Sequence, residues 1–238
     1  MRPQDYIPVS WRRNLQLVRR HWRDKQSGVN SQMASLQAAV PALPSQLTLR
    51  LEIKRTSTYA EKVHNFDTAN DQIERVLVMP DEVFSFWEAV GAPTKKRGYQ
   101  EGRTLIGGVL KPTVGGGLCQ LAGMLYYLGL QAGLEVMERH PHSVDIYTEE
   151  TRYTPLGSDA TVVYGYKDLR LRNVLAFPIA FQFEVGEGEI TLHLKAEEAP
   201  DAHIVEFNLI PTSGNKVGVE TWVGGESRGM VLYERFPG

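Results

Sequence analysis

The residues with the clearest potential for chemistry form the run GGGLCQ, Gly115 to Gln120, directly before a segment with helical periodicity. Three glycines without Cβ atoms let the backbone turn tightly and approach a ligand closely. The first amides of a helix lack intrahelical acceptors, and the positive end of the helix dipole favours a thiolate. Cys119 is therefore a candidate nucleophile, with amides near Gly117 and Cys119 available for an oxyanion. Gly115, Gly116, Gly117 and Gln120 are candidate substrate-binding residues. The alternative is that Cys119 is a small apolar core residue.

A nucleophilic cysteine needs a general base, and the run RHPHS supplies two histidines. His140 and His142 are two residues apart, and in a strand such residues point to the same side. We therefore expect both imidazoles to face the helix that Cys119 begins, with His140 slightly preferred as the base. Asp159, in GSDAT, is a candidate catalytic residue that orients an imidazole. The alternatives are structural or surface histidines and an ordinary turn aspartate.

Two further interpretations concern metal and substrate binding. Cys119, His140 and His142 also match a three-ligand zinc set with an open fourth position, but nothing else in the sequence supports a metal. We therefore expect no metal and no cofactor. Arg170 and Arg172, in DLRLRN, are candidate ligands for a substrate carboxylate, which the arginine fork matches with two hydrogen bonds. The alternative is an exposed strand face.

The hydrophobic pattern predicts the elements that position these residues. A helix from about Cys119 to Gln131 or Ala132 buries a stripe of Leu121, Leu125, Leu128 and Ala132 and ends at Gly133. Alternating residues predict a strand at 47–58, residues 83–91 predict a short strand and a turn, and residues 134–147 predict a strand. Seven further strands are predicted, with a hairpin turn at 186–189: residues 160–166, 169–175, 179–185, 189–196, 203–210, 216–223 and 230–236. The expected fold class is α+β, with a principal helix at about 119–132 packed on an antiparallel sheet and a β-rich C-terminal part.

The chain divides into two predicted units, residues 1–46 and residues 47–238. The first is a basic amphipathic helix, from about Trp11 to Gln26, followed by a linker. Its apolar residues recur on one face, and we favour burial of this stripe against the rest of the protein: Trp11, Leu15, Val18 and Trp22. The alternative is peripheral contact of residues 11–26 with an anionic membrane, with tryptophans in the interface and arginines at the headgroups.

Composition narrows the possible functions. The 42% apolar and 23% charged residues are ordinary for a globular protein, and the net charge of −2 gives no nucleic-acid signature. Residues 1–26 carry +5, so the remainder carries −7. The single cysteine forms no intramolecular disulfide. The absence of an apolar signal region predicts a cytoplasmic location, with membrane association through residues 11–26 as the alternative.

The order and spacing of several runs resemble the VanW family, named for an accessory protein of vancomycin-resistance gene clusters. These runs lie between about Met79 and Phe177: VFSFWEAVG, RGYQEG, IGG, GGGLCQ, LYY, ERHPHS and DATVVYGYKDLRLRN. The resemblance implies a VanW-like core at about 79–177 and a β-rich tail at 178–238. It also implies a bacterial, envelope-related protein.

The resemblance further implies a chemistry. Some multidomain relatives act as L,D-transpeptidases on peptidoglycan through a cysteine that matches Cys119, and His140, His142 and Asp159 match family positions as well. The expected function is cysteine-dependent acyl transfer or peptidase action on peptidoglycan peptides or precursors. The alternative is a non-catalytic binding module for a cell-wall peptide, or an accessory factor of glycopeptide resistance. Two features depart from the relatives. Small hydroxyl residues that many members carry are replaced by Ala122 and Gly123, and the peptidoglycan-binding repeats are missing.

Overall fold

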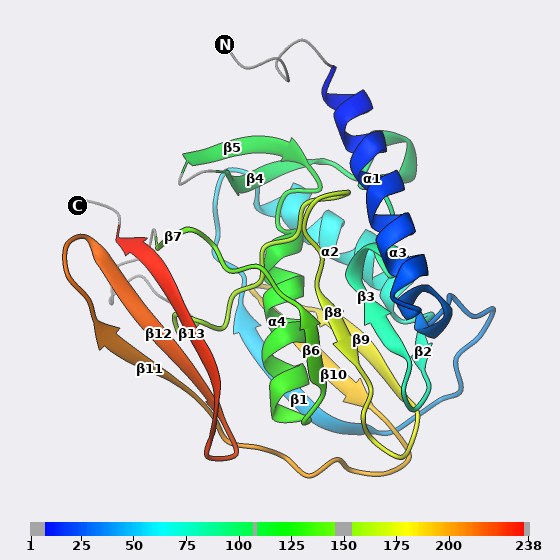
Figure 1. Cartoon of the computed structure of the whole chain (residues 1–238). Helices are drawn as coiled ribbons and strands as arrows, with labels where there is room; N and C mark the ends of the chain where they lie inside the picture. Colours follow the sequence, from blue (N-terminus) through cyan, green and yellow to red (C-terminus); the bar gives the residue numbers. More distant parts are fainter. Residues whose placement is uncertain (1–7, 107–108, 146–153, 236–238) are drawn as a thin grey trace.

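The computed structural model describes residues 8–106, 109–145 and 154–235, which form an α+β fold around one long helix (Figure 1). This helix is α4, Leu118–Gln131. Its predicted apolar stripe is buried, with Ala132 1% exposed and the three leucines not exposed at all. Gly133, at a φ of 73°, ends the helix in the left-handed conformation that favours glycine. The predictions of an α+β fold and of this principal helix are confirmed.

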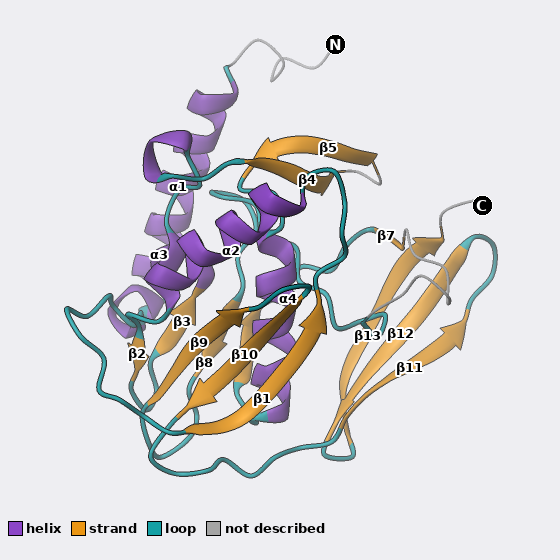
Figure 2. Ribbon diagram, turned by 180° about the vertical axis from the view of Figure 1, so that it is seen from behind, coloured by secondary structure: helices purple, strands orange, loops and turns teal. Residues whose placement is uncertain are grey.

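A four-stranded antiparallel sheet covers one side of α4 (Figures 1 and 2). Its order is β1 (Ser45–Glu52), β10 (Glu189–Lys195), β9 (Ile179–Val185) and β2 (Leu77–Val78). The predicted turn joins β9 to β10, where the Gly186 amide donates to the Glu189 carbonyl over 2.9 Å. The predicted strand at 47–58 stops at Glu52, because its partner β10 begins opposite, at Glu189.

A smaller sheet and two further helices complete the main core. The sheet has the order β3 (Val83–Ser85), β8 (Arg170–Arg172) and β6 (Glu135–Glu138). A short helix, α3 (Phe86–Val90), stands where a turn was predicted, because the Ser85 hydroxyl caps it by accepting from the Glu88 amide. Helix α2 (Tyr59–Ile73) contacts both β9 and α4. Two turns of 3-10 helix lie in the connections, Val29–Gln32 and Lys95–Arg97.

Two predicted strands are replaced by irregular backbone. Of the segment 134–147, the described part forms β6 and a two-residue strand, β7 (Val144–Asp145), with irregular backbone between them. Residues 160–166 contain one isolated bridge, from Val163 to Lys167. The strand prediction for 134–147 is thus confirmed only at β6 and β7, and that for 160–166 was wrong. The irregular parts of the two segments bond to each other and to side chains rather than to a ladder, as when the Thr161 amide donates to the His140 carbonyl over 2.6 Å.

The C-terminal strands form a separate sheet beside α4 in both ribbon views. Its order is β11 (Val205–Pro211), β12 (Lys216–Val223), β13 (Glu226–Arg235) and β7. Phe207 of β11 meets Tyr127 of α4 edge-on, with ring centroids 5.5 Å apart. A hairpin of β4 (Glu101–Ile106) and β5 (Val109–Val114) precedes α4. The β-rich C-terminal part is therefore confirmed.

Helix α1 (Val9–Gln26) forms where predicted but packs with the opposite face. The predicted buried stripe is exposed, by 72% at Trp11 and 57% at Trp22. The inward face is polar: Arg20 donates to both carboxylate oxygens of Glu138, at 2.9 and 2.7 Å, and Asp24 accepts from Arg170 at 2.8 and 2.6 Å. The apolar stripe is not buried because the surface that receives α1 presents charged groups. No described helix has both the length and the apolar composition that a membrane span requires.

The contact between Arg20 of α1 and Glu138 predicts that the protein loses stability in acid, as Glu138 becomes protonated. Burial alone would raise the pKa of Glu138, but hydrogen bonds from Arg20 and His140 outweigh it and lower the pKa from 4.5 to about 2. This stabilisation is complete above pH 4.5 and is lost as pH falls towards 2. It amounts to about 3 kcal/mol. Urea unfolding across this range should therefore show a smaller acid loss for Glu138→Gln than for wild type.

Glu135→Gln is the matched control, because Glu135 lies on the same strand but is more exposed and pairs with Arg172. It should retain the wild-type acid loss. Equal acid losses in wild type and Glu138→Gln would contradict the assignment.

Candidate functional site

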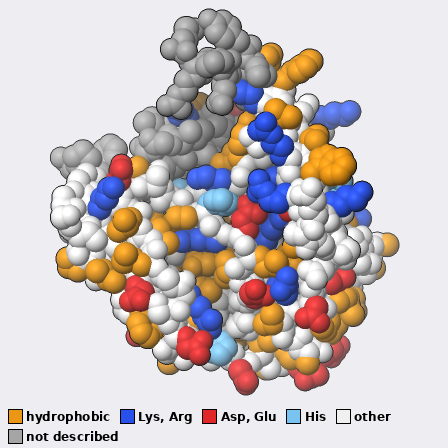
Figure 3. Space-filling model, in the orientation of Figure 1, with side chains coloured by type: hydrophobic (Ala, Val, Ile, Leu, Met, Phe, Trp, Pro, Cys, Tyr) orange, Lys and Arg blue, Asp and Glu red, His pale blue; other side chains and the backbone are white. Residues whose placement is uncertain are grey.

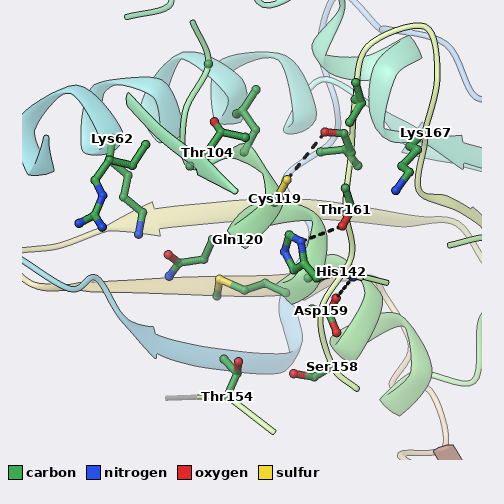
Figure 4. A pocket seen from close by; sticks show the side chains of 18 of the residues that line it. Lys62, Thr104, Cys119, Gln120, His142, Thr154, Ser158, Asp159, Thr161 and Lys167 are labelled. Carbon is green, nitrogen blue, oxygen red and sulfur yellow. Dashed lines mark hydrogen bonds between the residues drawn. The ribbon is translucent and has the colours of Figure 1, made fainter. Parts of the chain in front are cut away.

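A cavity of about 610 Å³ lies beside the first turn of α4, and Cys119, His142 and Asp159 all line it (Figure 4). Helix α4 supplies Cys119, and the irregular segments 139–143 and 154–167 supply most of the facing wall. Strands β1 and β5 and helix α2 contribute further wall residues, and Tyr233 comes from β13. The predicted cysteine, one predicted histidine and the predicted aspartate therefore meet at one cavity.

Cys119 is half-buried, and its thiol donates a long hydrogen bond of 3.7 Å to the Val162 carbonyl. Burial raises the pKa of the Cys119 thiol, and the nearby Asp159 carboxylate adds to this effect. The sequence predicts a thiolate from the helix position, whereas the surroundings in the folded chain favour the thiol. Any nucleophilic role of Cys119 therefore requires a base that removes its proton.

The backbone at the start of α4 leaves two amides available. The Leu118 amide donates to Gly115 over 3.4 Å and the Gln120 amide to Gly117 over 2.8 Å. Within the described part of the chain, the amides of Gly117 and Cys119 have no acceptor. These are the amides that the sequence analysis expects to stabilise an oxyanion.

The glycines of the turn have different roles. Gly117, at a φ of 101°, lines the cavity, and a Cβ there would lie 2.8 Å from a carbon of Lys62. Gly115 also lines the cavity. Gly116 is buried against the backbone of Gly102, and an added Cβ would lie 2.1 Å from it, so its role is packing rather than the predicted substrate contact. Gln120 lines the cavity, and its side-chain amide donates to the Glu52 carbonyl over 3.2 Å.

His142 is the histidine that faces the cavity. Its Nδ1 lies 2.9 Å from the Thr161 hydroxyl, and the ring lines the same cavity as Cys119 (Figure 4). Burial lowers the pKa of His142, so the ring is neutral near pH 7 and is able to accept a proton. No hydrogen bond joins the described Cys119 and His142 side chains, because the thiol points its proton at Val162 instead.

Asp159 positions His142 through the main chain rather than through the ring. One carboxylate oxygen accepts from the His142 amide over 2.5 Å. The other accepts from Arg139 over 3.1 Å and from the Tyr233 hydroxyl over 2.6 Å. The Arg139 guanidinium also donates to the carbonyls of Gly157 and Asp159, each over 2.8 Å. Arg139 lies in the run ERHPHS but has no pattern there that predicts this role, and nothing in the sequence links Tyr233 of β13 to this segment.

His140 lies outside the cavity, so the preference for it as the base is not supported. Its Nε2 bonds to Glu138 over 2.8 Å, in the cluster that docks α1. The prediction assumed a strand through both histidines, but β6 ends at Glu138 and the alternation stops there. The predicted zinc site of Cys119, His140 and His142 loses His140 as a ligand for the same reason. Among the described residues, no group of three histidine, cysteine or acidic side chains is arranged to hold a metal.

Arg170 and Arg172 also lie outside the cavity, so the structure does not place them as ligands of its substrate. Arg170 bonds to Asp24 and Asp168, and Arg172 bonds to Glu135 over 3.0 Å. Both belong to β8, which pairs with β3 and β6, and their charges are satisfied by structural acids.

The cations that line the cavity are ones that the sequence did not single out. They come from four separate segments: Lys54, Lys62, Arg103 and Lys167. Burial lowers the pKa of Lys62 to about 8, and repulsion from Arg103 and Lys54 contributes to this shift. Lys62 lies on α2 and Arg103 on β4, so only the packing of these elements brings the two charges together. The part of the cavity lined by Lys54, Lys62 and Arg103 therefore favours the binding of an anionic group.

The raised pKa predicts slow alkylation of Cys119. Iodoacetamide reacts with thiolates, so labelling of the native protein near pH 7 should be slower than labelling of free cysteine. The rate should continue to rise above pH ~9, beyond the pKa of an ordinary thiol. Intact-mass measurement is unambiguous because the chain has one cysteine.

The urea-unfolded protein is the control and should react like free cysteine. Faster labelling of the native protein than of free cysteine near pH 7 would show instead that the fold stabilises the thiolate.

Comparisons with known proteins agree on one family. The sequence pattern described as "VanW like protein" matches residues 61–195. The chain is 35% identical over 112 residues to the vancomycin B-type resistance protein VanW of Enterococcus faecalis, covering 47% of this chain and 41% of that protein. It is 27% identical over 180 residues to the uncharacterized protein YoaR of Bacillus subtilis, covering 72% of this chain and 58% of that protein. The chain thus spans about half the length of these relatives. No solved structure matches.

Proposed function

This chain belongs to the VanW family, and we propose that its cavity binds a cell-wall peptide or precursor and transfers an acyl group through Cys119. One observation carries the proposal: a thiol, a neutral imidazole and two amides without acceptors occur together at one cavity. These are the groups that thiol-dependent acyl transfer requires. The similarity to a protein named for vancomycin resistance supports a substrate from the cell wall.

The reaction proceeds through a thioester. His142 accepts the thiol proton of Cys119 as the sulfur attacks a peptide carbonyl carbon. The amides of Gly117 and Cys119 donate to the oxygen that gains negative charge. The carbon–nitrogen bond breaks, and His142 returns the proton to the departing amine. An acceptor amine or water then attacks the thioester carbonyl while His142 takes its proton. The carbon–sulfur bond breaks, and His142 passes the proton to the sulfur, which restores the thiol.

Formation of the thioester first requires the Cys119 proton to leave the Val162 carbonyl. Because the described side chains of Cys119 and His142 share no hydrogen bond, substrate binding must bring the thiol proton and the His142 ring together. Hydrogen bonds of catalytic groups are often long in ligand-free enzymes and tighten in the complex. The Asp159 carboxylate restricts this adjustment to the side chain, because it holds the main chain of His142.

The second candidate function is peptide binding without covalent chemistry, which the raised pKa and the thiol–carbonyl bond of Cys119 favour. In that case the cavity serves a binding module or a resistance accessory factor. The two functions share a ligand and differ in whether Cys119 becomes acylated.

An intact-mass experiment separates them. After incubation with muropeptides or cytoplasmic wall precursors, the acyl-transfer proposal predicts an added acyl mass on Cys119 that hydroxylamine removes. Cys119→Ala should show no adduct, and His142→Gln should form it roughly 100-fold more slowly, as expected for loss of a general base.

His140→Gln is the matched control, because this ring lies outside the cavity, and its rate should stay close to wild type. Binding of the same peptides with no adduct at any time would favour the binding module.

The pKa of Lys62 predicts how the affinity of the cavity for a peptide carboxylate changes with pH. Its pKa of about 8 means that its positive charge is lost as pH rises through 8, so affinity for a peptide carboxylate should fall between pH ~7 and ~9. Lys62→Gln should weaken binding roughly tenfold near neutral pH and remove most of this pH dependence. Calorimetric titration of Cys119→Ala with a muropeptide measures both effects without turnover.

Lys96→Gln tests whether any lysine has this effect, because Lys96 is exposed and outside the cavity. It should bind like the parent variant. A Lys62→Gln variant with unchanged affinity and pH dependence would remove Lys62 from the binding site.

A further inference from the structure

We propose that α1 docks the protein onto an anionic membrane surface through its exposed apolar row. This row is defined as Trp11, Leu15, Val18 and Trp22, whose side chains recur along one side of the helix. They are exposed by 72%, 47%, 52% and 57%. A row of large apolar side chains left in water marks an interaction site rather than ordinary surface. The proposal is independent of any chemistry at Cys119.

The helix is already fixed in place by its opposite face. Arg20 and Asp24 make paired contacts with Glu138 and Arg170. Gly165 approaches the same side so closely that an added Cβ would lie 3.1 Å from Arg13 and 3.4 Å from Leu17. Because the polar face packs on the protein, the apolar row cannot turn inward without breaking these ion pairs. Membrane docking therefore needs no folding of α1.

The charges beside the row match an anionic surface. Arg19, Arg23 and Lys25 are exposed, and Lys25 lies 5.7 Å from the centroid of the Trp22 ring. Asp24 is the one acidic residue of α1, and it faces inward towards Arg170. The outward side of α1 therefore presents apolar and cationic groups together, and Figure 3 shows orange and blue side chains gathered where α1 lies.

These side chains suit a lipid surface better than a protein groove. Trp11 and Trp22 are eleven positions apart, about 16 Å along the helix, so a helix lying flat places both at the same depth. Tryptophan prefers the headgroup region, and arginine and lysine can extend towards lipid phosphates while their stems stay in the apolar layer. An anionic membrane is therefore the partner that explains both the exposed tryptophans and the exposed cations of α1.

The apolar surface continues from α1 onto the turn that supports it. Val163 and Tyr166 are 44% and 43% exposed and flank Gly165, which contacts α1. Val163 also lines the Cys119 cavity. Docking through α1 would therefore keep the cavity close to the membrane surface.

Flotation of the full chain with lipid vesicles tests the proposal. Wild type should float with vesicles of phosphatidylcholine containing roughly one-third phosphatidylglycerol, should bind pure phosphatidylcholine much more weakly, and should be released by salt. Trp11→Ser combined with Trp22→Ser should weaken binding at least roughly tenfold. Arg19→Gln combined with Arg23→Gln and Lys25→Gln should weaken binding to the anionic vesicles by roughly tenfold or more.

The matched control is Leu209→Ser combined with Leu232→Ser, which removes two side chains of 50% exposure from the C-terminal sheet. It should float like wild type. Failure of wild type to float, equal binding to neutral vesicles, or full binding by the tryptophan variant would each overturn the proposal. A dimer in sedimentation that the tryptophan substitutions abolish, without vesicle binding, would show that a second copy covers the row instead.

Discussion

The Asp159 carboxylate connects the parts of the chain on which the site depends. It holds the main chain of His142, the guanidinium of Arg139 and the hydroxyl of Tyr233. Arg139 in turn lies over the Tyr126 ring of α4, 4.8 Å from its centroid. One half-buried negative charge thus joins the central helix, the irregular segment after β6 and the last strand. Because a buried carboxylate is costly unless its hydrogen bonds are satisfied, these partners hold one another in place.

A second group of buried charges holds α1 against the core. Glu138, Asp168 and Arg170 form a polar surface on the core, and Arg20 and Asp24 of α1 complete it. Asp168 also accepts from the Ser85 hydroxyl over 2.6 Å, next to the start of α3. Arg170 of β8, a candidate substrate ligand from the sequence, is therefore part of the contact that fixes the N-terminal helix.

Residues of the two groups are interleaved along one short stretch. Glu138, Arg139, His140 and His142 follow one another within five residues. Glu138 and His140 belong to the α1 contact, whereas His142 lines the cavity and Arg139 bonds to Tyr233, which also lines it. The strand alternation stops at the end of β6, and each of these side chains is held by its own partner instead. The quoted run ERHPHS thus serves packing and site geometry at once.

The sequence by itself determined the family, the α+β class, and the position of α4 with Cys119 in its first turn. These follow from local patterns, since apolar periodicity, helix-ending glycines and a distinctive motif order depend on near neighbours in the chain. Tertiary structure decided the rest. It put His142 rather than His140 at the cavity, replaced Arg170 and Arg172 with Lys62 and Arg103 as its cations, and added Tyr233 from β13. It also turned the apolar row of α1 outward. Each of these outcomes depends on which distant charges a side chain meets, and that pairing is fixed only when separate elements pack together.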